Sequence, residues 1–286
     1  MTRITVAIAF HDDDAHLAAA VRSILAQSFV DLEVLLLDDG STDRSVTVAR
    51  TFVHDPRVRV LVDGERRHLA ARLNQALSIA KGELFARMDA DDVSAPERLA
   101  RQVAALDASP ALDAVGTWAA MVDANEEAFG VIEAATEAPS SRSILERGLV
   151  AHATLLARTE WLRAQRYDES LHRAEDRDLW CRVGPAGRIG VVPELLYVVR
   201  IEPGRPAFLD DYRTGQRDLR RVILRHGPAS IGHGPSAFLA AKSLAKEQIF
   251  RLGHAVGLGE RLVRRRGRPI TATESARVRA ILRQTP

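Results

Sequence analysis

The sequence predicts an α/β protein with a mostly parallel central sheet that is flanked by helices. Three observations support this fold class. Apolar, strand-like runs alternate with segments of helical periodicity across the first two thirds of the chain, which is typical of parallel sheets with crossover helices. Several of these runs end in acidic residues, and beyond about residue 205 the pattern is helical only. We therefore expect an α/β domain over residues 1–205 and a basic helical C-terminal extension over residues 206–286.

The first predicted unit is strand, helix, strand. Residues 4–10 place alternate apolar side chains on one face, as in a strand. The acids at 12–14 then offer caps and first-turn charges for a helix with apolar positions at helical spacing over residues 17–25. Residues 32–37 are nearly all apolar, so this second strand should be buried on both faces.

The alternation continues along the chain. An acidic turn at 38–43 leads into a helix that should run to about Phe52, and residues 58–62 read as a third strand. Residues 69–80 have helical periodicity, and Gly82 lies where a glycine commonly ends a helix. Each strand is thus followed by a helix, which favours parallel pairing.

A cluster of carboxylates follows the fourth strand, residues 84–88. Asp89, Asp91 and Asp92 come directly after this apolar run. Mg²⁺ and Mn²⁺ prefer oxygen ligands, and Mg²⁺ commonly binds one or two carboxylates together with phosphate oxygens. The alternative is a solvated acidic turn or a helix cap at Asp92 or Ser94.

Carboxylates lie at the ends of more than one strand of the same sheet. Asp38 and Asp39 end the second strand, Asp12 and Asp13 follow the first, and residues 113–122 offer a fifth strand after the cluster. Parallel strands end at one edge, where open α/β sheets bind ligands, so these acids should converge there. The sequence has no dinucleotide-binding glycine motif and no P-loop.

Seven segments match one known family in order and spacing. These are Val6–His11, Ser23–Phe29, Leu37–Asp43, Ala80–Leu84, Ala86–Asp92, Pro96–Leu99 and Glu175–Trp180. Over roughly residues 3–202 the chain resembles the inverting family 2 glycosyltransferases, which have the GT-A nucleotide-sugar-binding fold. One departure is His11, where the family usually has Asn, and this concerns a detail of the nucleotide pocket.

The resemblance implies an enzyme that transfers a sugar, with inversion, from a nucleoside-diphosphate sugar to a hydroxyl acceptor. A UDP-sugar is the favoured donor, and the acceptor is a glycan, a lipid-linked saccharide or a small molecule. Asp39 matches the acid that binds the base. Phe10 matches the aromatic position beside the base, where much of the contact is expected from the main chain. Asp89 matches a ribose or metal contact and Asp91 the ligand of a divalent Mg²⁺ or Mn²⁺, with Asp92 as their supporting partner.

Asp176 matches the catalytic base of the family. Inverting transfer needs a carboxylate that takes the acceptor proton while the hydroxyl attacks opposite the leaving group. Glu175 and Asp176 also suit a helix N-terminus, where acids interact favourably with the helix dipole, and both roles can hold.

Four further residues match family positions around the donor or acceptor sugar: His152, Glu175, Trp180 and Arg200. The alternatives are a structural role for His152, an acid at a helix start for Glu175 and a buried aromatic side chain for Trp180. Arg200 matches a position near the diphosphate. Arg87 precedes the carboxylate cluster and has an acid of that cluster as its expected partner.

The C-terminal region is strongly basic. Residues 200–286 hold 18 Lys+Arg and 7 Asp+Glu, a net of +11, whereas residues 1–199 hold 22 and 31, a net of −9. The basic helices, with the run Arg264–Arg268, predict either peripheral contact with an anionic membrane or packing on the catalytic domain; we expect no nucleic-acid partner. The apolar stripe of these helices comprises Phe238, Leu239, Leu244, Ile249, Phe250, Leu252, Val256, Leu258 and Leu262.

Composition and motifs set further expectations. Hydrophobic residues make up 46% and charged residues 27% of the 286 residues, as in ordinary globular proteins. Cys181 is the only cysteine, which excludes a disulfide framework and a cysteine-based zinc site. No signal peptide or membrane-spanning run is evident, so we expect a cytoplasmic protein, either free or peripheral on the inner face of the membrane. The Q-x-x-R-W motif of processive synthases is absent, which predicts a non-processive enzyme.

Two other classes of protein compete with this interpretation. The first is a non-catalytic nucleotide-sugar-binding or assembly protein on the same fold, against which the intact Asp39, Asp91 and Asp176 argue. The second is a phosphoacceptor signalling domain. Asp63 resembles its acceptor acid, but no Lys follows Asp123 at the end of the fifth strand.

Overall fold

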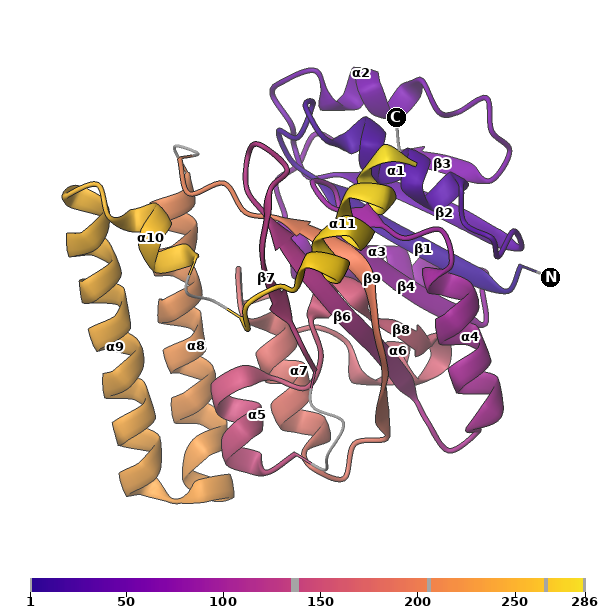
Figure 1. Ribbon diagram of the computed structural model, residues 1–286. Helices are drawn as coiled ribbons and strands as arrows, with labels where there is room; N and C mark the ends of the chain where they lie inside the picture. The colour runs from indigo at the N-terminus through magenta and orange to yellow at the C-terminus, as the bar shows by residue number, and fades with distance from the viewer. Residues whose placement is uncertain (1, 135–138, 205–206, 265–266, 285–286) are drawn as a thin grey trace.

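One twisted sheet forms the centre of the protein. The computed structural model describes residues 2–134, 139–204, 207–264 and 267–284 (Figure 1). Within these residues the strands lie in the order β3-β2-β1-β4-β8-β6-β9-β5, and β7 pairs with β6. The strands are β1 (Ile4–Phe10), β2 (Leu32–Asp38), β3 (Val58–Leu61), β4 (Leu84–Asp89), β5 (Val93–Ser94), β6 (Ala114–Val122), β7 (Ala128–Ile132), β8 (Leu156–Arg158) and β9 (Ile189–Arg200).

The N-terminal half of the sheet is parallel, as the alternation of strands and helices predicts. Strand β1 pairs in parallel with β2 and β4, and β2 pairs in parallel with β3. All seven residues of β2 are buried, because helices cover both faces of the sheet. Phe10, Asp38 and Asp89 end their strands at the same edge, where Phe10 aligns with Asp38 and Ala9 aligns with Asp89.

The second half of the sheet is mixed. Strand β8 has only three residues and runs antiparallel to both β4 and β6. Strand β7 returns along β6 in a hairpin, whereas β9 runs parallel to β6 with irregular register. The sequence pattern does not reveal β8, since three residues are too few for a period of two to be recognised.

Helices pack on both faces of the sheet. Apolar side chains of α1, α2 and α4 share one core with alternate residues of β1 and β2, including Val34 and Leu36. Side chains of α3, α5, α6 and α7 share a second core with Leu35 and Leu37. The helices are α1 (Leu17–Leu25), α2 (Ser45–Arg50), α3 (His68–Ile79), α4 (Arg98–Ala108), α5 (Ser141–Arg147), α6 (Thr159–Gln165) and α7 (Glu175–Val183), and a 3-10 turn spans His152–Thr154.

The acids at 12–14 do not cap α1, which is a correction to the sequence prediction. Helix α1 begins at Leu17, and its first turn contains no acidic residue. Asp12 instead accepts hydrogen bonds from the backbone N–H groups of Thr42, at 2.6 Å, and Asp43, at 3.2 Å. Asp12 therefore joins the loops that follow β1 and β2.

Gly82 does not end α3. The helix stops at Ile79, and Ala80 is already extended. A Cβ atom at position 82 would overlap the backbone N of Thr5, and the N–H of Gly82 donates to Thr5 Oγ1 at 2.9 Å. Glycine is needed here because the chain passes close to β1 before it enters β4.

The C-terminal segment consists of helices, namely α8 (Phe208–Ile231), α9 (His233–Ala255), α10 (Gly259–Val263) and α11 (Ala272–Arg283). Helices α8 and α9 form a hairpin beside the sheet, and α8 contacts α5 and α7 (Figure 1). Helix α11 returns to the sheet, where Val278 and Ile281 are buried with residues of β5, β6 and β9. No helix in the described part of the chain is long and apolar enough to cross a membrane. The predicted boundary at 205/206 lies outside the described residues, and the two-part division stays a prediction.

The run Arg264–Arg268 is attached to the body of the protein. Arg264 pairs with Asp123, and Arg268 pairs with Glu133 at 2.5 Å. Val131 and Arg268 also exchange backbone hydrogen bonds at 2.9 and 3.0 Å. Arg264 and Arg268 therefore form packing contacts of the kind that the second alternative predicts, and contact with lipid stays a prediction. Arg265 and Arg266 lie outside the described residues.

Candidate active site

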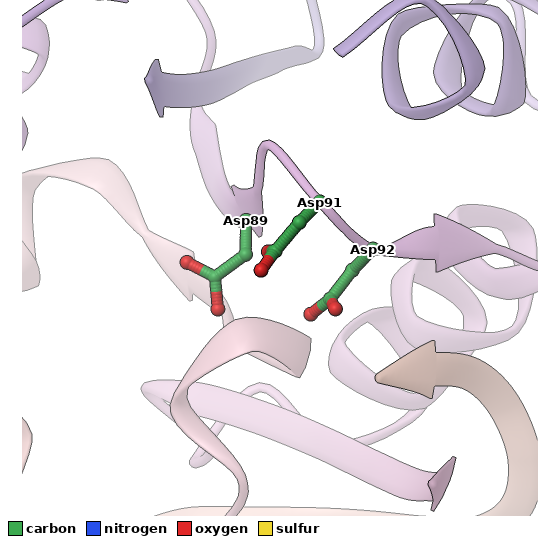
Figure 2. A group of neighbouring side chains, drawn as sticks. All are labelled: Asp89, Asp91 and Asp92. Atoms are coloured by element: carbon green, nitrogen blue, oxygen red, sulfur yellow. The ribbon is translucent and has the colours of Figure 1, made fainter. Parts of the chain in front are cut away.

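Three carboxylates gather in the turn after β4. Asp89, Asp91 and Asp92 each offer an oxygen atom, and these atoms lie within 4.8 Å of one another. Figure 2 shows the three side chains reaching from the turn toward the same side. Such a set of hard oxygen donors fits one Mg²⁺ or Mn²⁺ ion. The alternative of a helix cap at Asp92 or Ser94 is wrong, because α4 begins only at Arg98.

Neighbouring groups hold this cluster in place. Arg87 is buried and its guanidinium contacts Asp89, as expected from the sequence. The N–H of Asp89 donates to the Tyr197 hydroxyl at 3.1 Å, and the N–H of Arg200 donates to Asp92 Oδ1 at 2.9 Å. Burial, with the charges of Asp91 and Asp89, raises the pKa of Asp92 well above its usual range. A bound cation would offset this repulsion.

Asp39 organises the loop that follows β3. Its Oδ1 accepts hydrogen bonds from the N–H of Arg67 at 2.7 Å and from Arg72 Nε at 3.0 Å, and the N–H of His68 lies 3.1 Å from both oxygens. Arg72 is 1% exposed and also binds Asp63 at 2.8 Å. The hydrogen bonds from Arg72 lower the pKa of Asp63. Arg72 is not among the residues predicted from the sequence, although an arginine inside an apolar helical stripe indicates a buried acidic partner.

Phe10 does not present its ring to a nucleotide. The side chain is 2% exposed and belongs to the core between the sheet and α1. Its carbonyl oxygen accepts the N–H of Asp39 at 2.8 Å. A contact with the base at this position would therefore come from the main chain, and it stays a prediction. The neighbouring His11 is nearer the surface and contacts the guanidinium of Arg66 through Nε2.

Asp176 shares a cavity with the carboxylate cluster. It is the second residue of α7, is partly exposed, and accepts the N–H of Arg177 at 2.7 Å. The cavity has a volume of about 920 Å³, and Asp89, Asp176 and His152 are among its lining residues. Helix α7 and strand β4 thus direct carboxylates into one space from two sides.

His152 lines this cavity and belongs to a buried polar network. Its Nδ1 is 3.2 Å from Glu175 Oε1, and its Nε2 is 2.9 Å from the Tyr167 hydroxyl. Burial alone would raise the pKa of Glu175, but the hydrogen bond and charge of His152, with the charge of Arg87, lower it. Glu175 is therefore an ionised partner that orients His152.

Three of the residues predicted around the sugars do not line the cavity, and their sugar contacts stay predictions. Trp180 is fully buried and lies edge-on to His152, with 6.4 Å between ring centroids. Glu175 is buried and directed at His152. The guanidinium of Arg200 pairs with Glu126 at 2.8 Å, so Arg200 supports Asp92 through its backbone instead. Of the four residues predicted around the sugars, His152 lines the cavity.

Comparison with known proteins now identifies the family. The model of "Glycosyl transferase family 2" matches residues 5–166, more than half of the chain. The chain belongs to glycosyl transferase family 2. The matched region contains Asp39, Asp89 and Asp91 and ends before Asp176.

Relatives with sequence similarity agree with this assignment. The EpsE protein of Bacillus subtilis, named as a glycosyltransferase, is 34% identical over 210 residues, which cover 69% of this chain and 73% of EpsE. The O-antigen biosynthesis glycosyltransferase WbnJ of Escherichia coli is 29% identical over 184 residues, covering 63% of this chain and 71% of WbnJ.

Solved structures confirm the GT-A fold. The mannosyltransferase PcManGT from Pyrobaculum calidifontis, in complex with GDP-Man and Mn²⁺, superposes with a TM-score of 0.61 at 18% identity, over 99% of this chain and 85% of that one. S. aureus TarS 1–349 in complex with UDP-GlcNAc gives a TM-score of 0.61 at 21% identity, over 85% of this chain and 71% of TarS 1–349. At these identities the likeness establishes the fold of this family 2 member.

Proposed function

We propose that this family 2 glycosyltransferase is an inverting, metal-dependent enzyme that uses a nucleoside-diphosphate sugar, with a UDP-sugar favoured. The supporting observation is the shared cavity, in which Asp89 of the carboxylate cluster and the partly exposed Asp176 both take part in the lining. Asp91 and Asp89 would hold Mg²⁺ or Mn²⁺, and Asp39 lies at the same sheet edge for the base of the nucleotide. The metal supplies positive charge for the departing diphosphate when it is bound.

The protein's own residues account for the rest of the reaction. The acceptor oxygen forms a bond to the anomeric carbon as the bond from that carbon to the diphosphate oxygen breaks. Asp176 takes the hydroxyl proton, and the nucleoside diphosphate leaves on the opposite face. His152 lines the same cavity, and its ring is oriented by its contacts with Glu175 and Tyr167.

The relatives suggest a setting in polysaccharide assembly. WbnJ is named for O-antigen biosynthesis, and ExoO of Rhizobium meliloti, 32% identical over 112 residues, is named for succinoglycan biosynthesis. We therefore propose a saccharide or lipid-linked saccharide as acceptor. The absent Q-x-x-R-W motif supports transfer of one sugar per encounter. We place this transfer on the cytoplasmic side of the membrane as part of the same proposal.

We also propose peripheral contact with an anionic membrane, through the outer face of α9. Phe238, Ile249 and Leu252 of this helix, with Val256 at its C-cap, are exposed and follow helical spacing on the side away from the buried Leu239 and Phe250. Arg251, which precedes Leu252 in the chain, is also exposed. A helix with apolar side chains facing solvent and basic residues at its flanks suits an anionic lipid surface.

Screening of nucleotide sugars tests the proposed function directly. Thermal unfolding is measured with UDP-, GDP- and dTDP-sugars, each with and without Mn²⁺. A donor at a hundred times its Kd should stabilise the protein by about 2.7 kcal/mol. The anomeric configuration of the product is then read by NMR. Retained configuration would contradict the inverting mechanism, and donor binding without any turnover would favour the non-catalytic alternative.

A further inference from the structure

A second cavity lies on the other side of Asp176. Its volume is about 1030 Å³, and it is lined by α5 and β7 of the body and by α8 and α9 of the C-terminal hairpin. Four residues line both this cavity and the first one: Ile132, Glu133, Arg147 and Asp176. The two cavities therefore meet at Asp176, which faces both.

The lining of this second cavity is apolar at the helix packing and charged elsewhere. Leu145, Ile223 and Leu239 are buried together where α5, α8 and α9 meet. Two lysine or arginine side chains of the lining are already neutralised. Lys242 Nζ lies 3.3 Å from Glu146 Oε1, and Arg268 pairs with Glu133 at 2.5 Å.

The remaining cations of the lining are not neutralised. Arg147 and Lys246 are exposed, and neither forms an ion pair with any carboxylate in the described ranges. Arg177 uses Nη1 to donate to the carbonyl of Leu145 at 2.7 Å, while its buried Nε has no partner. Apart from the acids already paired with Lys242 and Arg268, Asp176 is the carboxylate of this lining. The cavity therefore carries an excess of positive charge.

We propose that this second cavity binds the acceptor, and that the acceptor is a saccharide bearing a phosphoryl group. Arg147 and Lys246 bind the phosphoryl oxygens, and a hydroxyl of the saccharide reaches Asp176 at the junction. This inference rests on the proposed function. It follows from the geometry, because the acceptor must approach Asp176 from the side that the donor does not fill. Guanidinium and ammonium groups suit phosphoryl oxygens, and the cavity has the size of a ligand site.

Binding of three soluble probes tests the proposal. The first is a decyl pyrophosphoryl N-acetylglucosamine, the second is the decyl N-acetylglucosaminide without phosphate, and the third is inorganic pyrophosphate. Affinities are measured by calorimetry with the full chain, below the aggregation concentration of each probe. The first probe should bind at least about tenfold more tightly than the second, since a hydrogen bond to a charged group commonly contributes that much. Its affinity should fall as salt rises.

Charge-removing variants then locate the site. Arg147→Ala and Lys246→Ala should each weaken the first probe by about tenfold and leave the second unchanged. Arg142→Ala is the matched control, because Arg142 lies on α5 with Arg147 and lines neither cavity. All of these side chains are exposed, so folding should be preserved, and circular dichroism verifies this.

Each possible outcome bears on the proposal. A first probe that binds no better than the neutral one, including no binding by either, overturns it. The proposal is also overturned if inorganic pyrophosphate binds as tightly as the first probe, because the site would then recognise an anion without a saccharide. Binding of UDP with Mn²⁺ to the wild-type protein is measured alongside. If that binding is intact while phosphoryl discrimination is missing, only this inference fails and the proposed donor function stands.

Discussion

The sheet edge after β4 and the C-terminal segment are both highly charged, but they arrange charge in opposite ways. At the edge, oxygen atoms of the carboxylates of Asp89, Asp91 and Asp92 lie within 4.8 Å of one another, and Arg87 pairs with Asp89. In the C-terminal segment, arginines such as Arg264 and Arg277 pair with acids of the body, here Asp123 and Glu97. Like charges kept together are costly unless a cation binds them, whereas opposite charges that pair across a boundary attach one segment to another. The clustered carboxylates therefore indicate a cation-binding site, and the ion pairs indicate how the C-terminal segment is attached to the body of the protein.

The largest effect is expected from Asp91→Ala, which removes one carboxylate from the cluster at the sheet edge. Loss of one ligand should abolish Mn²⁺-dependent binding of UDP and reduce turnover by more than about 10²-fold, since even supporting partners of a metal ligand cost about 10–100-fold. Calorimetry of UDP with Mn²⁺ measures the binding. Asp210→Ala, an exposed acid on α8, is the control. Unchanged affinity in the Asp91 variant would show that the cluster is not a metal site.

Asp176→Asn should affect the reaction without affecting donor binding. The amide keeps the size of the side chain but cannot take the acceptor proton. We expect kcat to fall by about 10²–10⁴-fold, the usual scale for a positioned base, and nucleotide affinity to stay near wild type. Steady-state kinetics with the donor found by screening measures both quantities. A variant that keeps more than about a tenth of the wild-type kcat would place the base elsewhere.

In the C-terminal segment, Ile281→Ala should change stability and not chemistry. Ile281 is fully buried against strands of the second half of the sheet. Truncation should lower the free energy of unfolding by about 2–5 kcal/mol, which urea denaturation measures. The kcat of the folded fraction should equal that of wild type. A large fall in kcat at unchanged stability would mean that α11 takes part in the reaction.

Substitutions on the outer face of α9 test whether the C-terminal helices contact a membrane or only pack on the rest of the protein. Leu252→Glu and Ile249→Glu should reduce sedimentation with anionic liposomes by at least about tenfold, because each removes an exposed apolar side chain from the lipid contact. Arg264→Ala should not reduce it, since Arg264 is paired with Asp123. Absence of wild-type sedimentation at any salt concentration would contradict the membrane proposal.

The smallest effect is expected from the ion pair that fixes the start of α11. The hydrogen bond from Arg268, with those from Thr271, lowers the pKa of Glu274 to about 2 from 4.5. Because the folded pKa is depressed, this stabilisation is present above about pH 4.5 and is lost as pH falls toward 2. Glu274→Gln should cost less than about 1 kcal/mol near neutral pH, as for other exposed pairs, and progressively less as pH falls through about 2. Thermal unfolding of both proteins across this range measures the difference. A difference that grows as pH falls would contradict the assignment.

The parallel half of the fold could be predicted from sequence because its signal is local. Each strand from β1 to β4 has its own apolar run, and each helix its own period, so the convergence of Asp39 and Asp89 at one edge followed from the fold class. The contacts of Trp180 and Arg200 could not be predicted in this way. Whether Trp180 is buried depends on its packing against His152, and the direction of Arg200 depends on Glu126, which is distant in sequence. The basic composition of the tail likewise gave no indication of which acids would neutralise it.

The return of α11 has a consequence for the order in which the protein assembles during synthesis. Val278 and Ile281 complete a core that also contains Val93 and Val198, so contacts far apart in sequence must close it. Until residues 272–283 have emerged from the ribosome, the strands of this core expose apolar surface. The carboxylate cluster next to β5 is formed from residues made much earlier. A nascent chain can therefore carry every ligand of the proposed metal site while it still lacks the helix that covers the neighbouring strands, and the apolar surface exposed in that interval favours association.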